Sequence, residues 1–364
     1  MTRVPMALLF ATSLIGQDAG NRPSVNLFFD GYYSWNVNRP QNRTNALRAY
    51  DTSSNSFALS QVGIVVEQAP EVAKKKPFGY RLDLMFGPAT ETLQGSPANE
   101  NRPQIYRNIF QAYGTYIVPV GSGLTVDFGK WASALGPEGN YAKDQINYSR
   151  SYFFNYLPFY HMGVRTTYNL NKRVSAAYWL VNGANQTEDF NGFKSQLAQV
   201  VVKPGKNISW TANYYAGQEQ RASNGRMHIL DTYAFWNVTE KLTVGGELDY
   251  VISRIAAHDA PQRVTGGAAY LRLQLMPRVY FGQRYTRLND LAGLFSGVSQ
   301  KLNDLTSTVG FRPREGFEVR GEYRRDFSDV AYFTRREPAM PLSKHQETFT
   351  VGLLWWFGGK TGSW

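Results

Sequence analysis

The chain has 364 residues and a formal net charge of +11, and 15% of its residues are aromatic whereas only 18% are charged. The absence of cysteine excludes disulfide bonds, thiolate metal sites and cysteine nucleophiles. Basic residues are spread along the chain among acids, unlike the concentrated patch of a nucleic-acid-binding protein, and the charge-free run from Asn108 to Val126 contains too many glycine, proline and polar residues for a transmembrane helix.

The N-terminal segment resembles a short secretory signal. Arg3 precedes an apolar run from Val4 to Gly16, and small and polar residues follow this run. A basic residue before a short apolar stretch is typical of export signals. We therefore predict that residues 1–20 form a signal peptide, the alternative being a disordered N-terminus.

From residue 24 onward, apolar and polar side chains alternate with a period of two. Between Leu242 and Tyr250, for example, apolar residues and glycines are interleaved with Thr243, Glu247 and Asp249. This alternation predicts strands with one apolar and one polar face. About sixteen segments show it: 24–36, 56–68, 77–86, 109–118, 122–131, 160–169, 173–182, 193–203, 206–217, 227–238, 241–252, 263–275, 277–287, 304–312, 315–327 and 346–357.

The connections between these segments are alternately short and long. Residues 119–121 and 204–205 are short connections, whereas residues 37–55 and 88–108 are long ones. Short periplasmic turns and long extracellular loops are typical of outer-membrane barrels. A β-sandwich or propeller would also alternate, but its strands are shorter than the ~9–11 residues needed to cross a bilayer. Tyrosine and tryptophan near the strand ends also favour a barrel with aromatic girdles.

A barrel of about sixteen strands is too wide for side chains to fill, so inward-facing charges become the candidate functional surface. Rings of basic side chains in such a lumen favour anions. The alternative is that these charges are paired across neighbouring strands and only keep the lumen wet. The strand residues concerned are Arg81, Asp83, Arg165, Glu247, Asp249, Arg272, Arg284, Arg320, Glu322 and Arg324.

The connection from Ala132 to Phe159 is rich in tyrosine and phenylalanine, which have little reason to face water in a surface loop. We predict that it folds into the barrel and narrows the pore. Glu138, Lys143, Asp144 and Arg150 would then stand near the constriction. The alternative is an outward loop that shields the rim.

Catalytic patterns are weak in this sequence. The four histidines lie in unrelated segments, and no metalloprotease or serine-hydrolase motif occurs. His258 and Asp259 form an adjacent pair in a predicted external loop, and this pair supports a barrel enzyme only as a minor hypothesis. We predict no enzymatic activity, no metal site and no cofactor.

Several sequence segments, taken in their order along the chain, resemble the putative beta-barrel porin-2, OmpL-like outer-membrane family, most densely over residues 24–217. They are FFDGYYSWNVNRPQN (28–42), FALSQVGIVVEQ (57–68), FGYRLDLMFG (78–87), VDFGKWASALGPE (126–138), NYSRSYFFNY (147–156) and HMGVRTTYNL (161–170). The resemblance implies an outer-membrane barrel, monomeric or oligomeric, with no agreed substrate. Alternation would place Lys130 on the lipid face, so we expect the strand to end there or a bulge to turn Lys130 inward.

The last strand carries Phe349, Val351, Leu353, Trp355 and Phe357 on one face, similar to the C-terminal signal of outer-membrane proteins. We expect the outer-membrane assembly machinery to bind it, and residues 358–364 to form a short tail.

The sequence therefore predicts an all-β protein, an antiparallel transmembrane β-barrel over residues 24–357, in the bacterial outer membrane. We expect passive diffusion of small hydrophilic solutes or ions, with a preference for anions. The alternative is a structural or adhesive barrel whose lumen is plugged by the loop. The expected partners are outer-membrane lipids, the solutes and further copies of the chain, but not nucleic acid.

Overall fold

The computed structural model describes residues 23–94, 98–337, 339–360 and 363–364. The predicted signal segment, residues 1–20, lies outside this range. No helix among the described residues is long and apolar enough to cross a membrane.

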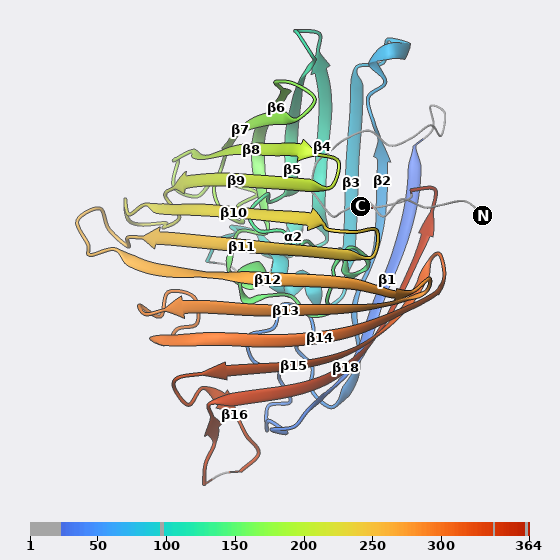
Figure 1. Cartoon of the computed structure of the whole chain (residues 1–364). Coiled ribbons are helices and arrows are strands. Elements are labelled where there is room, and N and C mark those ends of the chain that lie inside the picture. Colours follow the sequence, from blue (N-terminus) through green and yellow to red (C-terminus); the bar gives the residue numbers. More distant parts are fainter. Residues whose placement is uncertain (1–22, 95–97, 338, 361–362) are drawn as a thin grey trace.

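Sixteen antiparallel strands form a closed barrel, in which the last strand pairs with the first (Figure 1). Every other neighbouring pair follows chain order, apart from the step from β15 to β18. The strands are β1 (Ser24–Asn36), β2 (Ser56–Gln68), β3 (Phe78–Phe86), β4 (Ile109–Val118), β5 (Leu124–Ala132), β6 (Tyr160–Asn169), β7 (Val174–Val181), β8 (Ser195–Gly205), β9 (Ile208–Gly217), β10 (Met227–Asn237), β11 (Leu242–Ser253), β12 (Gln262–Met276), β13 (Val279–Asp290), β14 (Gln300–Arg314), β15 (Phe317–Ser328) and β18 (His345–Gly358).

The predicted fold class and strand number are confirmed, and the expected spans differ from the observed strands by a few residues at most ends. The period of two explains this agreement, because successive side chains of a strand point to opposite faces of the sheet. On the outer face, Phe57 is 87% exposed, Phe78 71% and Leu248 66%. An apolar outer face is the arrangement that lipid requires of a barrel.

Aromatic side chains pack against one another on the outer face near both ends of the strands. Trp35 on β1 lies 5.7 Å from Phe349 on β18, measured between ring centroids. Near the other end of β18, Trp355 lies 5.2 Å from Phe29 and 4.9 Å from Phe317. Such pairs match the two girdles that outer-membrane barrels place at the membrane interfaces.

The connections differ between the two ends of the barrel. The short-turn end, where β1 begins and β18 ends, includes the connections at residues 206–207, 277–278 and 315–316. The long-loop end carries the extended connections, including residues 37–55, 87–108 and 133–159. These long connections contain short elements that alternation does not predict: α1 (Ala89–Gln94), α2 (Pro103–Tyr106), η2 (Ala142–Asp144), α3 (Tyr152–Tyr156), and the hairpin of β16 (Phe333–Thr334) with β17 (Leu342–Ser343). A further short helix, η1 (Val72–Lys74), lies in the β2–β3 connection at the short-turn end.

Lys130 corrects one expectation from the sequence. It pairs in register with Ala112 on β4 and Met162 on β6, so β5 neither ends nor bulges at this residue. Its position on the outer face is nevertheless only 2% exposed. The Lys130 ammonium donates a hydrogen bond to Gln94 of the β3–β4 connection and lies 3.8 Å from the centre of the Tyr160 ring. The connection thus covers Lys130. The Gln94 oxygen and the Tyr160 ring take the place of the water molecules that would solvate the ammonium group on an exposed surface.

The connection between β5 and β6, residues 133–159, is called the inserted loop below. It lies inside the ring of strands (Figure 1). Tyr152, Phe153 and Leu157 of this loop are at most 2% exposed and pack in a core with Leu288 and Leu302 of the barrel wall. Ser151 caps α3, since its hydroxyl accepts a hydrogen bond from the Phe154 N–H at 3.3 Å. The aromatic content of the loop is therefore buried against the inner wall.

Candidate functional site

Charged side chains form a ladder on the inner faces of β13, β14 and β15. Arg320 Nε lies 2.6 Å from Glu318 Oε1, and Arg324 Nη2 lies 2.8 Å from Asp326 Oδ1. Every second residue of β15 points inward, which brings these groups onto one face. The ladder consists of Arg284, Asp304, Glu318, Arg320, Glu322, Arg324 and Asp326, each at most 5% exposed.

The ladder holds the backbone of the inserted loop. Arg320 Nη1 donates to the Asn147 carbonyl at 3.0 Å, Arg284 Nη1 to the Ser149 carbonyl at 2.7 Å, and Arg324 Nη1 to the Arg150 carbonyl at 2.6 Å. Buried backbone groups must find partners, and guanidinium groups have donors left after pairing with a carboxylate. The ladder arginines therefore serve the ion pairs and the loop at once.

Carboxylates complete the attachment. Glu322 accepts the backbone N–H groups of Tyr148 at 2.6 Å and Ser149 at 3.0 Å. Glu138 of the loop lies 2.9 Å from Arg284 Nη1. Hydrogen bonds to ionised groups are stronger than neutral ones, so these contacts fix the loop against the wall.

Contacts on its other side tie the inserted loop to β1 and to the β1–β2 connection. The Tyr148 hydroxyl donates to Asp30 on β1 at 2.6 Å. Burial, with the nearby Asp30 carboxylate, raises the pKa of Tyr148 well above its usual value. Arg150 donates to the Asn140 carbonyl at 2.8 Å, and its guanidinium carbon lies 5.2 Å from the centre of the Tyr50 ring. The loop thus bridges two parts of the wall.

Lys143 and Asp144 lie apart from the ladder, beside the C-terminal residue. Lys143 Nζ is 2.8 Å from Asp144 Oδ1 and 4.7 Å from the centre of the Trp364 ring. The Trp364 N–H donates to Asp144 Oδ2 at 3.0 Å. Burial lowers the pKa of the Lys143 ammonium.

The inner wall of β3 to β6 carries charges that remain partly accessible. Arg81 Nε lies 2.8 Å from Asp83 Oδ1, and Arg165 Nε lies 2.8 Å from Asp127 Oδ2. The side chains of Arg81 and Arg165 are 10% and 13% exposed, whereas those of Asp83 and Asp127 are 0% and 3% exposed. On this wall the two arginine side chains keep more exposed surface than the carboxylates with which they pair.

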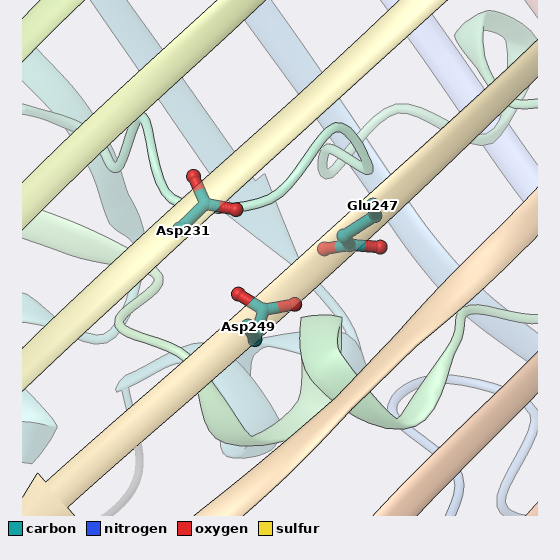
Figure 2. A group of neighbouring side chains, drawn as sticks. All are labelled: Asp231, Glu247 and Asp249. Carbon is teal, nitrogen blue, oxygen red and sulfur yellow. The ribbon is translucent and has the colours of Figure 1, made fainter.

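Glu247 and Asp249 on β11 form a group with Asp231 on β10 (Figure 2). Asp231 and Asp249 are direct partners in the strand register, and Glu247 is two residues before Asp249 on the same face. All three are buried. Sequence reasoning missed Asp231, which shares the inner face of β10 with Ile229 and Tyr233, two residues away on either side.

The residues predicted from the sequence therefore form no single ring. Glu138, Arg150, Arg284, Arg320, Glu322 and Arg324 meet in one buried cluster. Arg81 with Asp83, Arg165, Lys143 with Asp144, and Glu247 with Asp249 lie in four other places. Sequence reasoning also missed Asp304, Glu318 and Asp326, and strand parity could have found them.

The His258–Asp259 pair gains no support from the structure. Both residues are exposed in the β11–β12 connection, and Asp259 Oδ2 accepts the Ala256 N–H at 2.9 Å. The Asp259 carboxylate therefore caps its own turn.

Several solved porins and outer-membrane channels of very different sequence share this architecture. The anion-selective porin of Comamonas acidovorans aligns with a TM-score of 0.61 at 10% identity, over 92% of this chain and 99% of that chain. The channel DcaP of Acinetobacter baumannii aligns with a TM-score of 0.59 at 12% identity, over 94% and 100%. The trimer form of OmpT from Vibrio cholerae aligns with a TM-score of 0.54 at 10% identity, over 92% and 99%.

No curated protein matches the sequence significantly. The model of the family described as putative beta-barrel porin-2, OmpL-like, matches residues 24–357, which is nearly the whole barrel. Together with the closed ring of sixteen strands and its apolar outer face, this match shows that the chain belongs to the putative beta-barrel porin-2, OmpL-like family of the bacterial outer membrane.

Proposed function

We propose that the protein is a channel for passive diffusion of small hydrophilic solutes across the outer membrane. The observation that carries this proposal is that the inserted loop, although it contacts the wall on several sides, leaves part of the inner-wall charge accessible. Its buried ion pairs lie on β13 to β15, whereas Arg81 and Arg165 on β3 to β6 keep part of their surface accessible. A solute path along the β3–β6 wall is lined by fixed charge, the usual basis of selectivity in such pores.

An anion preference stays a prediction. It is supported by two ion pairs in which the arginine is more exposed than the carboxylate. Arg165 is more exposed than its partner Asp127, and near the short-turn end the Arg312 side chain is 39% exposed while that of Glu318 is 0% exposed. A passing ion would meet the guanidinium groups before the carboxylates. One of the structural neighbours is itself an anion-selective porin.

A structural or adhesive barrel with a closed lumen is the second candidate. Contacts of the inserted loop with a further part of the wall favour it. Asn213 on β9 donates to the Ala134 carbonyl at 2.9 Å, and Arg48 of the β1–β2 connection reaches Asp326 at 2.8 Å. The loop and this connection therefore occupy much of the interior near the long-loop end.

Assembly is part of the proposal. One structural neighbour is described as a trimer form, and we propose that this chain also forms homo-oligomers in the membrane. We further propose that the short-turn end faces the periplasm, by analogy with other outer-membrane barrels. β18 would then present the signal to the assembly machinery.

Single-channel recording in a planar bilayer under a salt gradient tests the channel. We expect stable open steps and a reversal potential whose sign indicates preferential permeation of anions. Arg165→Gln should shift the reversal potential toward cations, because Asp127 then loses its compensating charge. Arg325→Gln is the matched control, since Arg325 lies on the outer face of β15, paired with Glu347 at 3.5 Å.

Each outcome separates the candidates. Open steps with cation preference in the unmodified protein would refute the anion preference and keep the channel. A folded barrel that never conducts would refute the channel and favour the closed lumen.

A further inference from the structure

The acidic group on β10 and β11 has the geometry of a cation site. One carboxylate oxygen from each of Asp231, Glu247 and Asp249 lies within 4.8 Å of the others. Figure 2 shows the three side chains converging on the space between the two strands. Oxygen ligands on opposite sides of one calcium ion, each at about 2.3–2.6 Å, are about 5 Å apart, so a single calcium ion can contact all three carboxylates.

The hydrogen bonding of this group is incomplete. The Tyr270 hydroxyl donates to Glu247 Oε2 at 2.8 Å, and Asn213 Nδ2 donates to Asp231 Oδ2 at 2.6 Å. Asp231 Oδ1 and both carboxylate oxygens of Asp249 have no hydrogen-bond partner, although Asp249 is only 5% exposed. A buried carboxylate without a partner is costly, so its free oxygens point to a missing positive ligand.

No lysine or arginine of the described residues forms a salt bridge with the three carboxylates. The ladder arginine whose charge reaches Glu247, Arg284, is already bound to Glu138 and Asp304. Asp231 and Asp249 are also direct cross-strand partners, an arrangement that is destabilising for like charges. Uptake of a proton or of a metal ion from solution would offset this repulsion.

We propose that Asp231, Glu247 and Asp249 bind a calcium ion. A donor set made only of oxygen selects hard cations, and Mg²⁺ demands shorter and more regular ligand distances than Ca²⁺. The site lies beside the start of the inserted loop, because Asn213 bridges Asp231 to the Ala134 carbonyl. Gly136 approaches Glu247 so closely that an added Cβ would lie 3.0 Å from Glu247 Oε1. Calcium thereby stabilises the wall where this loop begins.

Terbium luminescence of the full refolded barrel, stripped with EDTA, tests the site. Nearby Tyr270 can transfer excitation to a bound Tb³⁺. We expect one Tb³⁺ per barrel, displaced by Ca²⁺ more readily than by Mg²⁺. Asp249→Asn should weaken Tb³⁺ binding at least about ten-fold. Removing a residue that only hydrogen-bonds to a metal ligand already costs about that much affinity, and removing a ligand itself costs more. Asp127→Asn, on β5 and outside this group, is the control and should bind as the unmodified protein does.

Thermal unfolding gives a second readout, in which removing a carboxylate should not destabilise the metal-free barrel. Ca²⁺ should raise the melting temperature of the unmodified barrel, because a ligand that binds only the folded state stabilises it. In EDTA, Asp249→Asn should melt at the same temperature as the unmodified barrel or at a higher one, since one of three repelling charges is gone. Ca²⁺ should no longer change the melting temperature of this variant.

Three results would overturn the proposal. They are equal Tb³⁺ binding by Asp249→Asn, no effect of Ca²⁺ on the unmodified barrel, and a clearly lower melting temperature of Asp249→Asn in EDTA. The last result would mean that two of the carboxylates share a proton instead of a metal ion. If Asp249→Asn does not fold, the Tb³⁺ stoichiometry and the calcium-dependent melting of the unmodified barrel decide. These readouts do not depend on ion conductance, so they test the calcium site even if the barrel does not conduct.

Discussion

Glu322 illustrates how single residues of the lumen act. Its carboxylate accepts Tyr148 N, Ser149 N and the Thr308 hydroxyl, the last at 2.7 Å. A carboxylate offers several acceptor positions, whereas a glutamine amide offers one acceptor oxygen and two donors. The charge therefore organises the turn of the inserted loop, and it does not serve as a free lumen charge.

Glu322→Gln should lower the free energy of unfolding by about 1.5–3 kcal/mol, the usual contribution of a hydrogen bond to a charged group. The amide NH2 group faces backbone N–H donors and leaves at least one of them unsatisfied. Urea titration of the barrel in lipid vesicles, followed by tryptophan fluorescence, measures the change.

Glu347→Gln provides the matched control for this experiment. Glu347 lies on the outer face of the neighbouring β18, its side chain is 26% exposed, and it pairs with Arg325 at 3.5 Å. Partly exposed pairs contribute little, so this variant should unfold within about 0.5 kcal/mol of the unmodified barrel. Equal losses in both variants would show that Glu322 does not anchor the loop.

At the scale of elements, β18 closes the barrel. It pairs with β1 on one side and β15 on the other, and Phe349 and Trp355 join the aromatic pairs of the outer face. Without it, two strand edges would be left with unpaired backbone groups, which lipid cannot satisfy.

Deleting residues 349–357 should therefore abolish assembly in the outer membrane, whereas deleting residues 358–364 should leave it intact. The tail does make contacts, since Lys360 lies 2.8 Å from Glu67 and the Trp364 N–H binds Asp144. These contacts lie inside the ring and close no strand edge. Heat-modifiable gel mobility of both deletions is the measurement. A barrel that still shifts in mobility without residues 349–357 would contradict the role assigned to β18.

At the scale of the whole molecule, the net charge of +11 is a poor guide to the interior. In the ladder the carboxylates outnumber the guanidinium groups, and nearly all of these groups are paired and buried. In the proposed channel, selectivity would then depend on accessible members of ion pairs, such as Arg165, and on the width that the inserted loop leaves.

Replacing residues 140–150 with a glycine-serine linker of equal length should increase the single-channel conductance several-fold. The bulky side chains of Tyr141, Tyr148 and Arg150 leave the lumen, while the barrel strands keep all their pairings. The same type of replacement in the exposed connection 254–261 is the control and should leave conductance unchanged. An unchanged conductance in the first variant would show that the inserted loop does not limit the path.

Much of this architecture follows from the sequence alone. Strand number, span and the inner or outer face of each side chain depend on a period of two, which neighbouring residues encode locally. The inward position of Arg284, Arg320, Glu322 and Arg324 is predictable for the same reason. The aromatic content of residues 132–159 likewise predicts burial, because such side chains are unfavourable in water.

Only the tertiary structure decided which charges meet. Asp304 on β14 comes beside Arg284 and Arg324 through strand pairing, and the inserted loop adds Glu138 from more than a hundred residues away. Asp231 joins Glu247 and Asp249 through the register of β10 against β11. Lys130 keeps its outward position because a connection covers it. Pairing partners and loop paths depend on contacts between distant residues, and alternation along one strand carries no information about them.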